Sequence, residues 1–213
     1  MKTLVFLHTA GVHVQNFEAL LRELCPGTNA RHVVREDLLA MARETGADSK
    51  ALREAMKQTM KDIGDAAEVL CTCSTVGGVA ESAGAAAGIS VHRIDRAMAE
   101  RAVEFGSNIV VAAALESTLA PTEALIIECA ARAGVDCRMK RVVVNEAWPL
   151  FERGDIDGYL DRIAAALQCA PPCDVIVLAQ ASMAGAAERC PNLKAPVLAS
   201  PRLGLEAALA RLG

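Results

Sequence analysis

The sequence predicts an α/β protein made of two pseudo-symmetric domains, each with a mostly parallel sheet flanked by helices. Short runs rich in Val, Ile and Leu alternate with longer helical patterns, and each run ends in small or polar residues. An internal repeat with an offset of about 106 residues indicates that one βα unit is duplicated.

The first half of the chain carries four predicted strands and four predicted helices. The strands are expected at residues 3–7, 31–34, 68–72 and 89–93. The helices are expected near residues 14–23, from about residue 49, after Gly77 and Gly78, and from about residue 96. The helix near residue 49 has apolar residues every three or four positions, at Leu52, Met56, Met60 and Ile63. One stripe of it is therefore buried, with Asp48 or Ser49 as its N-cap.

The second half repeats this plan. Strands are expected at residues 108–114, 141–144 and 174–179, helices at 121–133 and 156–167, and a last strand and helix within 196–212. Pro121 fits the first turn of its helix because its missing N–H would have no intrahelical partner there.

The repeat defines the predicted domains, residues 1–95 with 205–213 and residues 96–204. Val91 and Arg96 recur as Val197 and Arg202 at an offset of about 106, and residues 69–75 fall on residues 176–182 at about 107. The second match pairs Cys73 with Gln180. Two such halves are expected to form an active-site cleft between them, because ligands of open α/β sheets bind beyond the carboxyl ends of strands.

Composition excludes several classes of protein. The 213 residues carry a net charge of −4 without any basic run, which argues against nucleic acid as a partner. The apolar stretches are too short to span a membrane, and residues 3–7 are a first strand rather than part of a signal peptide. A soluble, cytoplasmic protein is expected, whose eight cysteines stay reduced.

The most informative segment is 71–78, Cys-Thr-Cys-Ser-Thr-Val-Gly-Gly. It ends an apolar strand and opens a helix, whose free N–H groups favour a thiolate at Cys73. Ser74 and Thr75 add hydroxyl donors for a carboxylate or enolate. The alternatives are a small buried cysteine at a tight turn, or zinc held by cysteine pairs at 71/73 and 169/173, whose spacing does not match a zinc knuckle.

Polar residues also follow the first strands of both halves. Thr9 comes after the first strand, and Ser117 and Thr118 come after the strand that ends near Ala114. Small hydroxyls with nearby backbone amides bind carboxylates without an arginine. Each can equally be a turn or capping residue. The four histidines, at 8, 13, 32 and 92, lack metal-ligand spacing and are expected to be hydrogen-bonded structural residues.

These motifs resemble the aspartate/glutamate/hydantoin racemase superfamily over essentially the whole chain. The resemblance rests on residues 7–9, 32–39, 73–77, 117–122, 177–184 and 196–201. It implies two α/β domains, a homodimer, a small carboxylate substrate and no cofactor or metal. In two-cysteine racemases of this family, one thiolate removes the α-proton while the other thiol protonates the opposite face. Cys73 matches the first cysteine.

This sequence departs from the family at Gln180, which stands where the second cysteine is expected. Gln has no titratable proton, so two-base racemisation is in doubt, and Ser182 is the nearest substitute. Cys73 is therefore expected to act alone, as acid/base or nucleophile, in an isomerase, a racemase or a one-cysteine decarboxylase. A small-acid-binding protein without catalysis is the other alternative. The predicted substrate-binding residues are Thr9, Ser74, Thr75, Ser117, Thr118, Gln180 and Ser182.

Overall fold

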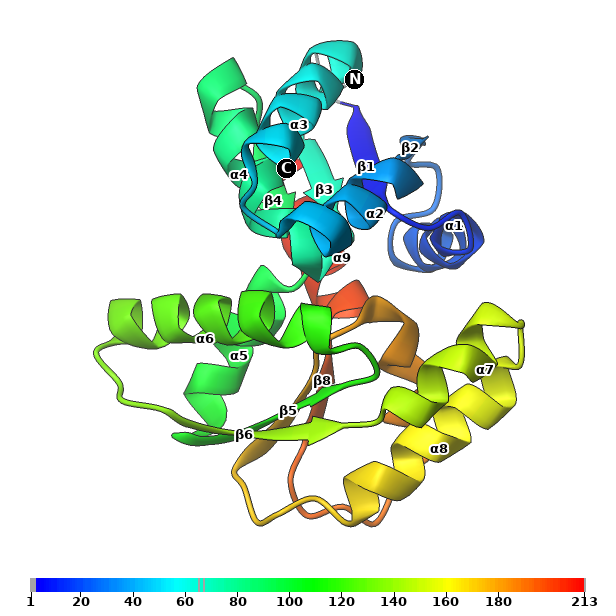
Figure 1. The fold of residues 1–213 in the computed structure, drawn as a ribbon, viewed down its shortest axis with the longest axis vertical. Helices are drawn as coiled ribbons and strands as arrows, with labels where there is room; N and C mark the ends of the chain where they lie inside the picture. The colour runs from blue at the N-terminus through cyan, green and yellow to red at the C-terminus, as the bar shows by residue number, and fades with distance from the viewer. Residues whose placement is uncertain (1–2, 65, 67, 213) are drawn as a thin grey trace. The chain divides into compact units, whose positions relative to one another are not determined.

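The computed structural model describes residues 3–64, 66 and 68–212. The chain divides into two compact units, which we call the first domain (Met1–Ile94 with Pro201–Gly213) and the second domain (Asp95–Ser200). Both are α/β, and each is described by itself (Figure 1).

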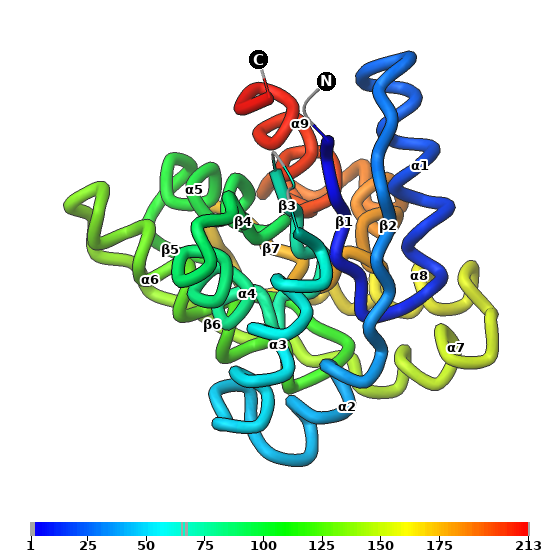
Figure 2. Tube along the Cα trace, turned by 90° about the horizontal axis from the view of Figure 1, so that it is seen from above, coloured from blue at the N-terminus to red at the C-terminus, as the bar shows by residue number. Residues whose placement is uncertain are grey.

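The first domain is built on a four-stranded sheet with the order β2-β1-β3-β4, in which all neighbours are parallel. The strands are β1 (Leu4–His8), β2 (Ala30–Val34), β3 (Glu68–Cys71) and β4 (Val91–Arg93). Figure 2 shows β1 running beside β2, with α1 next to β2 in this view. The C-terminal ends of all four strands lie at one edge of the sheet.

Alternation along β1 divides the apolar side chains between the two faces of this sheet. Leu4 and Phe6 pack with helices α1 (His13–Leu24) and α9 (Ser200–Leu212). Val5 and Leu7 pack on the other face, with α2 (Glu36–Thr45), α3 (Lys50–Ile63) and α4 (Ser74–Ala87). Both faces are buried, as is typical of a parallel sheet.

The second domain repeats this topology, with the parallel order β6-β5-β7-β8. Its strands are β5 (Asn108–Ala113), β6 (Arg138–Val143), β7 (Val175–Leu178) and β8 (Val197–Ala199). Its helices are α5 (Arg96–Phe105), α6 (Leu119–Ala133), α7 (Trp148–Glu152) and α8 (Ile156–Gln168), with 3-10 segments η1 (Glu116–Thr118), η2 (Asn145–Ala147) and η3 (Ala181–Ala186). Tyr159 and Ile163 of α8 pack on one face of this sheet.

Two pairs of backbone hydrogen bonds establish which residues of the two sheets correspond. Thr72 N–H donates to the carbonyl of Leu7 (3.0 Å), as Ala179 N–H donates to that of Ala112 (2.9 Å). Arg35 N–H donates to the carbonyl of His8 (2.8 Å), as Val144 N–H donates to that of Ala113 (2.8 Å). The ends of β1 and β3 therefore correspond to those of β5 and β7. The predicted pseudo-symmetric α/β class is confirmed.

Several local predictions need correction. Helix α4 begins at Ser74, so Gly77 and Gly78 lie within its first two turns rather than before it. Helices α2 and α7 were not expected. Strand β6 begins at Arg138, three residues earlier than predicted, because most side chains of this edge strand are exposed and show no apolar alternation. Ser49 caps α3, accepting from Leu52 N–H at 3.2 Å, as expected.

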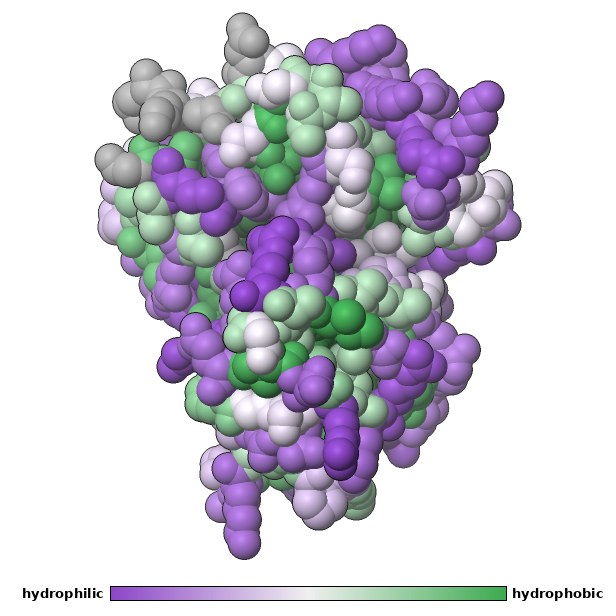
Figure 3. Space-filling model, turned by 90° about the vertical axis from the view of Figure 1, so that its left-hand side faces the viewer, coloured by the Kyte–Doolittle hydropathy of each residue, from purple (hydrophilic) through white to green (hydrophobic). Residues whose placement is uncertain are grey.

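The face drawn in Figure 3 carries many hydrophilic side chains with smaller apolar areas between them. Among the described residues, the large hydrophobics that are exposed are Val12, Val34, Phe105, Ile127, Val135, Val143 and Ile156. Within the same residues, every helix is too short or too polar to cross a lipid bilayer.

Candidate active site

Cys73 lies where β3 passes into α4. The strand ends at Cys71, and Cys73 is the N-cap residue of the helix, with an extended backbone (φ −112°, ψ 117°). The first N–H groups of a helix have no intrahelical acceptor and carry a partial positive charge. The predicted strand-to-helix transition is thus confirmed, and the half-buried thiol stands beside donors that suit an anion.

Thr75, in the first turn of α4, has a buried hydroxyl without a hydrogen-bond partner. Its side chain is 5% exposed, and its Oγ1 is one of two such orphaned side-chain atoms among the residues that the structure describes. Leaving a buried hydroxyl unpaired costs about 1–3 kcal/mol. A donor held unpaired two residues from Cys73 indicates a place for a ligand oxygen.

A second pair of donors follows β1, which is the neighbour of β3 in the sheet. The backbone N–H groups of Thr9 and Ala10 come directly after this strand, and Thr9 is buried. No acceptor for either N–H exists in the part of the chain that the structure describes. Thr9, Ser74 and Thr75, all predicted site residues, thus lie at the C-terminal edge of the first sheet.

The corresponding position of the second domain holds Gln180. This residue is the N-cap of η3 (φ −132°, ψ 136°), two residues beyond β7, as Cys73 is two residues beyond β3. Its side-chain Oε1 accepts hydrogen bonds from the N–H groups of Ala114 (2.6 Å) and Leu115 (3.1 Å). Ala114 and Leu115 correspond to Thr9 and Ala10, so the second domain contains the same donor pair with an oxygen already bound.

Arg93 is a buried cation beside α4 that the sequence analysis missed. It ends β4, and its Nη2 donates to the carbonyl of Ser74 at 3.4 Å. A Cβ at Gly77 would lie 2.8 Å from Cγ of Arg93, so only glycine leaves room for this side chain. The available signal was the glycine pair itself, which makes space on a helix surface for a neighbour.

No protein-family model matches this sequence, and no curated protein matches it. Solved structures do match over nearly the whole chain. An aspartate racemase of Picrophilus torridus superposes with a TM-score of 0.66 at 13% identity, covering 99% of this chain and 94% of its own. A Thermus thermophilus glutamate racemase gives 0.63 at 18%, covering 98% and 80%. Arylmalonate decarboxylase gives 0.58 at 15%, covering 99% and 92%.

This chain has the Asp/Glu racemase fold. The resemblance found in the motifs and the likeness of the structures agree. At these identities the likeness establishes the architecture, and the chemistry has to be argued from the residues of this chain.

Within this racemase fold, two buried residues, Thr72 and His8, form a hydrogen-bond chain with the half-buried His32 next to Cys73. Nδ1 of His8 lies 2.9 Å from Oγ1 of Thr72, and Nε2 of His8 lies 2.9 Å from Nδ1 of His32. Burial, followed by repulsion from His32 and His13, lowers the pKa of His8 to about 3. His8 is therefore a neutral structural ring that fixes Thr72 and, with it, the strand end that carries Cys73.

Two predicted site hydroxyls of the second domain, those of Thr118 and Ser182, have partners within that domain. Thr118 Oγ1 donates to the carbonyl of Leu115 (2.8 Å), and Ser182 Oγ lies 2.8 Å from the phenol oxygen of Tyr159. Burial raises the pKa of Tyr159 to about 12, so this phenol stays protonated and does not activate Ser182 as a base. Ser117 is half-buried on η1.

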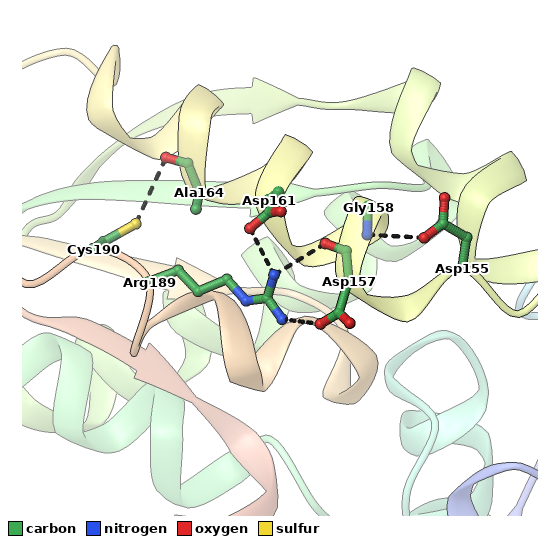
Figure 4. A network of polar contacts seen from close by, with 7 residues as sticks. All are labelled: Asp155, Asp157, Gly158, Asp161, Ala164, Arg189 and Cys190. Carbon is green, nitrogen blue, oxygen red and sulfur yellow. Dashed lines mark hydrogen bonds and ion pairs between the residues drawn. The ribbon is translucent and has the colours of Figure 1, made fainter.

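The segment that follows Gln180 is fastened to α8 (Figure 4). Arg189 bridges Asp157 and Asp161, at 2.6 Å to an Oδ1 of each. Cys190 Sγ contacts the carbonyl of Ala164 at 3.6 Å. These contacts, with the Tyr159 to Ser182 bond, hold η3 in place at the end of β7.

Proposed function

We propose that this chain is a cofactor-independent enzyme that acts on a small carboxylate, an amino acid or a related acid, through Cys73. One observation carries the proposal. Cys73, at the N-cap of α4, belongs to the same sheet edge as three donors that have no acceptor among the described residues, the backbone N–H groups of Thr9 and Ala10 and the hydroxyl of Thr75. An anion at this edge would satisfy all of these donors.

The residues divide into two roles. The N–H groups of Thr9 and Ala10 and the hydroxyls of Ser74 and Thr75 bind the carboxylate and the enediolate formed from it. Preorganised donors of this kind stabilise developing charge with little reorganisation, which is often the largest catalytic contribution. Cys73 transfers the proton. Substrate contacts by Ser117, Thr118, Gln180 and Ser182 stay predictions, as do the homodimer and the cytoplasmic location.

The first reaction class is proton transfer at the carbon next to the carboxylate. The Cys73 thiolate takes the α-proton, and the electron pair of the C–H bond moves into the enediolate. Reprotonation by the thiol then restores both the carbon acid and the thiolate. Racemases with the same fold support this class as the family of reaction.

Decarboxylation is the second candidate, and Gln180 favours it. One proton donor suffices for this reaction. The bond from the α-carbon to one carboxyl group breaks and carbon dioxide leaves with the electron pair remaining on the carbon. The Cys73 thiol then protonates that carbon and solvent restores the thiol proton. Arylmalonate decarboxylase has the same fold.

Proton NMR in D₂O tests the proposal on a panel of aspartate, glutamate, other amino acids, malonates, maleate and hydantoins. We expect loss of an α-proton signal, or a new product, with the native protein and not with Cys73→Ala. Cys169→Ser is the matched control, since Cys169 is an exposed thiol of the second domain. Full activity of folded Cys73→Ala would refute the role of Cys73. Carboxylate binding without turnover across the panel would establish the binding protein instead.

A further inference from the structure

Each domain has a corresponding pair of backbone N–H donors, but only the pair in the second domain has an acceptor among the described residues. In the second domain, the N–H groups of Ala114 and Leu115 converge on Oε1 of Gln180. In the first domain, the corresponding N–H groups of Thr9 and Ala10 have no acceptor among the described residues, and Cys73 stands in the place of Gln180. The difference follows from side-chain length, because a cysteine ends at Sγ, two atoms short of the reach of a glutamine oxygen.

We infer that the carboxamide of Gln180 is a built-in occupant of the carboxylate position in the second domain, so that this chain binds a carboxylate at the first domain alone. The inference rests on the proposed function only for the identity of the ligand. Gln180 thereby has two effects. It supplies no titratable proton, and its oxygen occupies the two N–H donors that a carboxylate would need.

The contacts of Gln180 oppose its displacement. The side chain is buried, at 8% exposure, and Ala114 is fully buried. A ligand that took the two N–H groups would remove both hydrogen bonds from Oε1 and leave a buried amide oxygen unpaired, which costs about 1–3 kcal/mol. Ser182 of η3 bonds to Tyr159 of α8, and Arg189, three residues beyond η3, bridges two aspartates of α8 (Figure 4). Both contacts restrict movement of the backbone that carries Gln180.

The position of Oε1 also indicates where a carboxylate oxygen would bind in the first domain. An oxygen at 2.6 Å and 3.1 Å from two successive backbone nitrogens is the geometry that the second domain realises. Because β1 and β5 end in the same way, a carboxylate oxygen can take this geometry at Thr9 and Ala10. Gln180 is therefore an internal model of the bound ligand.

Titration of ¹⁵N-labelled full-length protein with acetate, followed by amide NMR, tests the inference without any need for turnover. In the native protein, we expect acetate to shift the Thr9 and Ala10 amides and to leave those of Ala114 and Leu115 unchanged. Gln180→Ala removes the acceptor and empties the position that it occupies, so acetate should then shift all four amides. Gln180→Glu keeps an acceptor oxygen and should behave as the native protein does.

Each outcome has a distinct reading. Shifts of Ala114 and Leu115 in the native protein, or none in a well-dispersed spectrum of Gln180→Ala, would overturn the closure by Gln180. A response of these two amides in Gln180→Ala without any response at Thr9 and Ala10 would support the closure and refute the proposed carboxylate site. Inactivity on every substrate, together with the expected amide shifts, would refute the proposed enzymatic activity and would support the inference about Gln180.

Discussion

Nε2 of His8 lies 2.9 Å from Nδ1 of His32, with the two ring planes 8° apart and 5.2 Å between their centroids. A single proton fits between two facing ring nitrogens, so one ring donates and the other accepts. Nδ1 of His8 is engaged with Thr72 on its other side. The arrangement is compatible with neutral imidazoles, and a positive charge on His8 would be repelled by His32 and by His13.

This relationship predicts that the folded protein becomes less stable as the pH is lowered. In the unfolded chain His8 takes up a proton near its ordinary pKa of 6.5, whereas in the folded protein it does so only at about 3. The unfolded state therefore binds more protons between these values, and the free energy of unfolding falls as pH is lowered through this range, by on the order of 4 kcal/mol. Urea unfolding of the native protein and His8→Gln at several pH values measures it. The variant should have the shallower pH dependence, and equal slopes would contradict the prediction.

The adjacent glycines of α4 allow a matched test of the space that Arg93 occupies. A methyl group at Gly77 would lie 2.8 Å from Cγ of Arg93, whereas at Gly78 the nearest atom, Nη1 of Arg93, is 3.9 Å away. We expect Gly77→Ala to lower the free energy of unfolding by about 1–3 kcal/mol through overpacking. Gly78→Ala should be neutral or raise it by up to about 1 kcal/mol, because alanine favours helix. Thermal and urea unfolding measure both, and equal effects would show that Arg93 is not held there.

Thiol labelling tests the environment of Cys73 against the other cysteines. Burial raises the pKa of four thiols, Cys129, Cys137, Cys173 and Cys190. Because the thiolate is the reactive form, these four should react slowly with iodoacetamide near neutral pH. Peptide mass spectrometry should find Cys73 modified before them, and a bound small carboxylate should slow Cys73 without slowing the exposed Cys169. Labelling of Cys73 no faster than that of the buried thiols would contradict the proposed site.

The sequence predicted the two sheets because parallel strands buried on both faces show as continuous Val, Ile and Leu runs. It also placed Cys73 and Gln180 at corresponding strand ends, since the repeat preserves their distance from β3 and β7. Helices α2 and α7 were missed because both are short and their apolar residues are consecutive, at 38–42 and 148–151, so they show no helical periodicity. Strand β6 was shortened in prediction because an exposed edge strand does not need alternation.

The contacts within the candidate site depend on tertiary packing that periodicity does not encode. The repeat predicted Gln180 as a substrate-binding residue, but it does not reveal that the side-chain oxygen accepts from Ala114 and Leu115. Backbone donors such as the N–H of Ala10 leave no mark on the sequence, because every residue except proline carries one. The partner of Ser182, Tyr159, lies 23 residues away on another helix.

A single acid/base predicts a stereochemical outcome for any substrate with an α-hydrogen. Cys73 removes the proton, the thiol so formed exchanges its hydrogen with D₂O, and it then returns deuterium to the same face, so exchange in D₂O should exceed loss of optical purity by about tenfold or more. Mass spectrometry for deuterium and chiral chromatography for configuration measure the two rates. Gln180→Cys places a thiol at the corresponding position and frees the N–H groups of Ala114 and Leu115. By the resemblance to two-cysteine racemases, it should raise racemisation relative to exchange, while Gln180→Ala, which frees the same groups without a thiol, should not. Equal rates of exchange and racemisation in the native protein would mean that a group other than Cys73 protonates the opposite face.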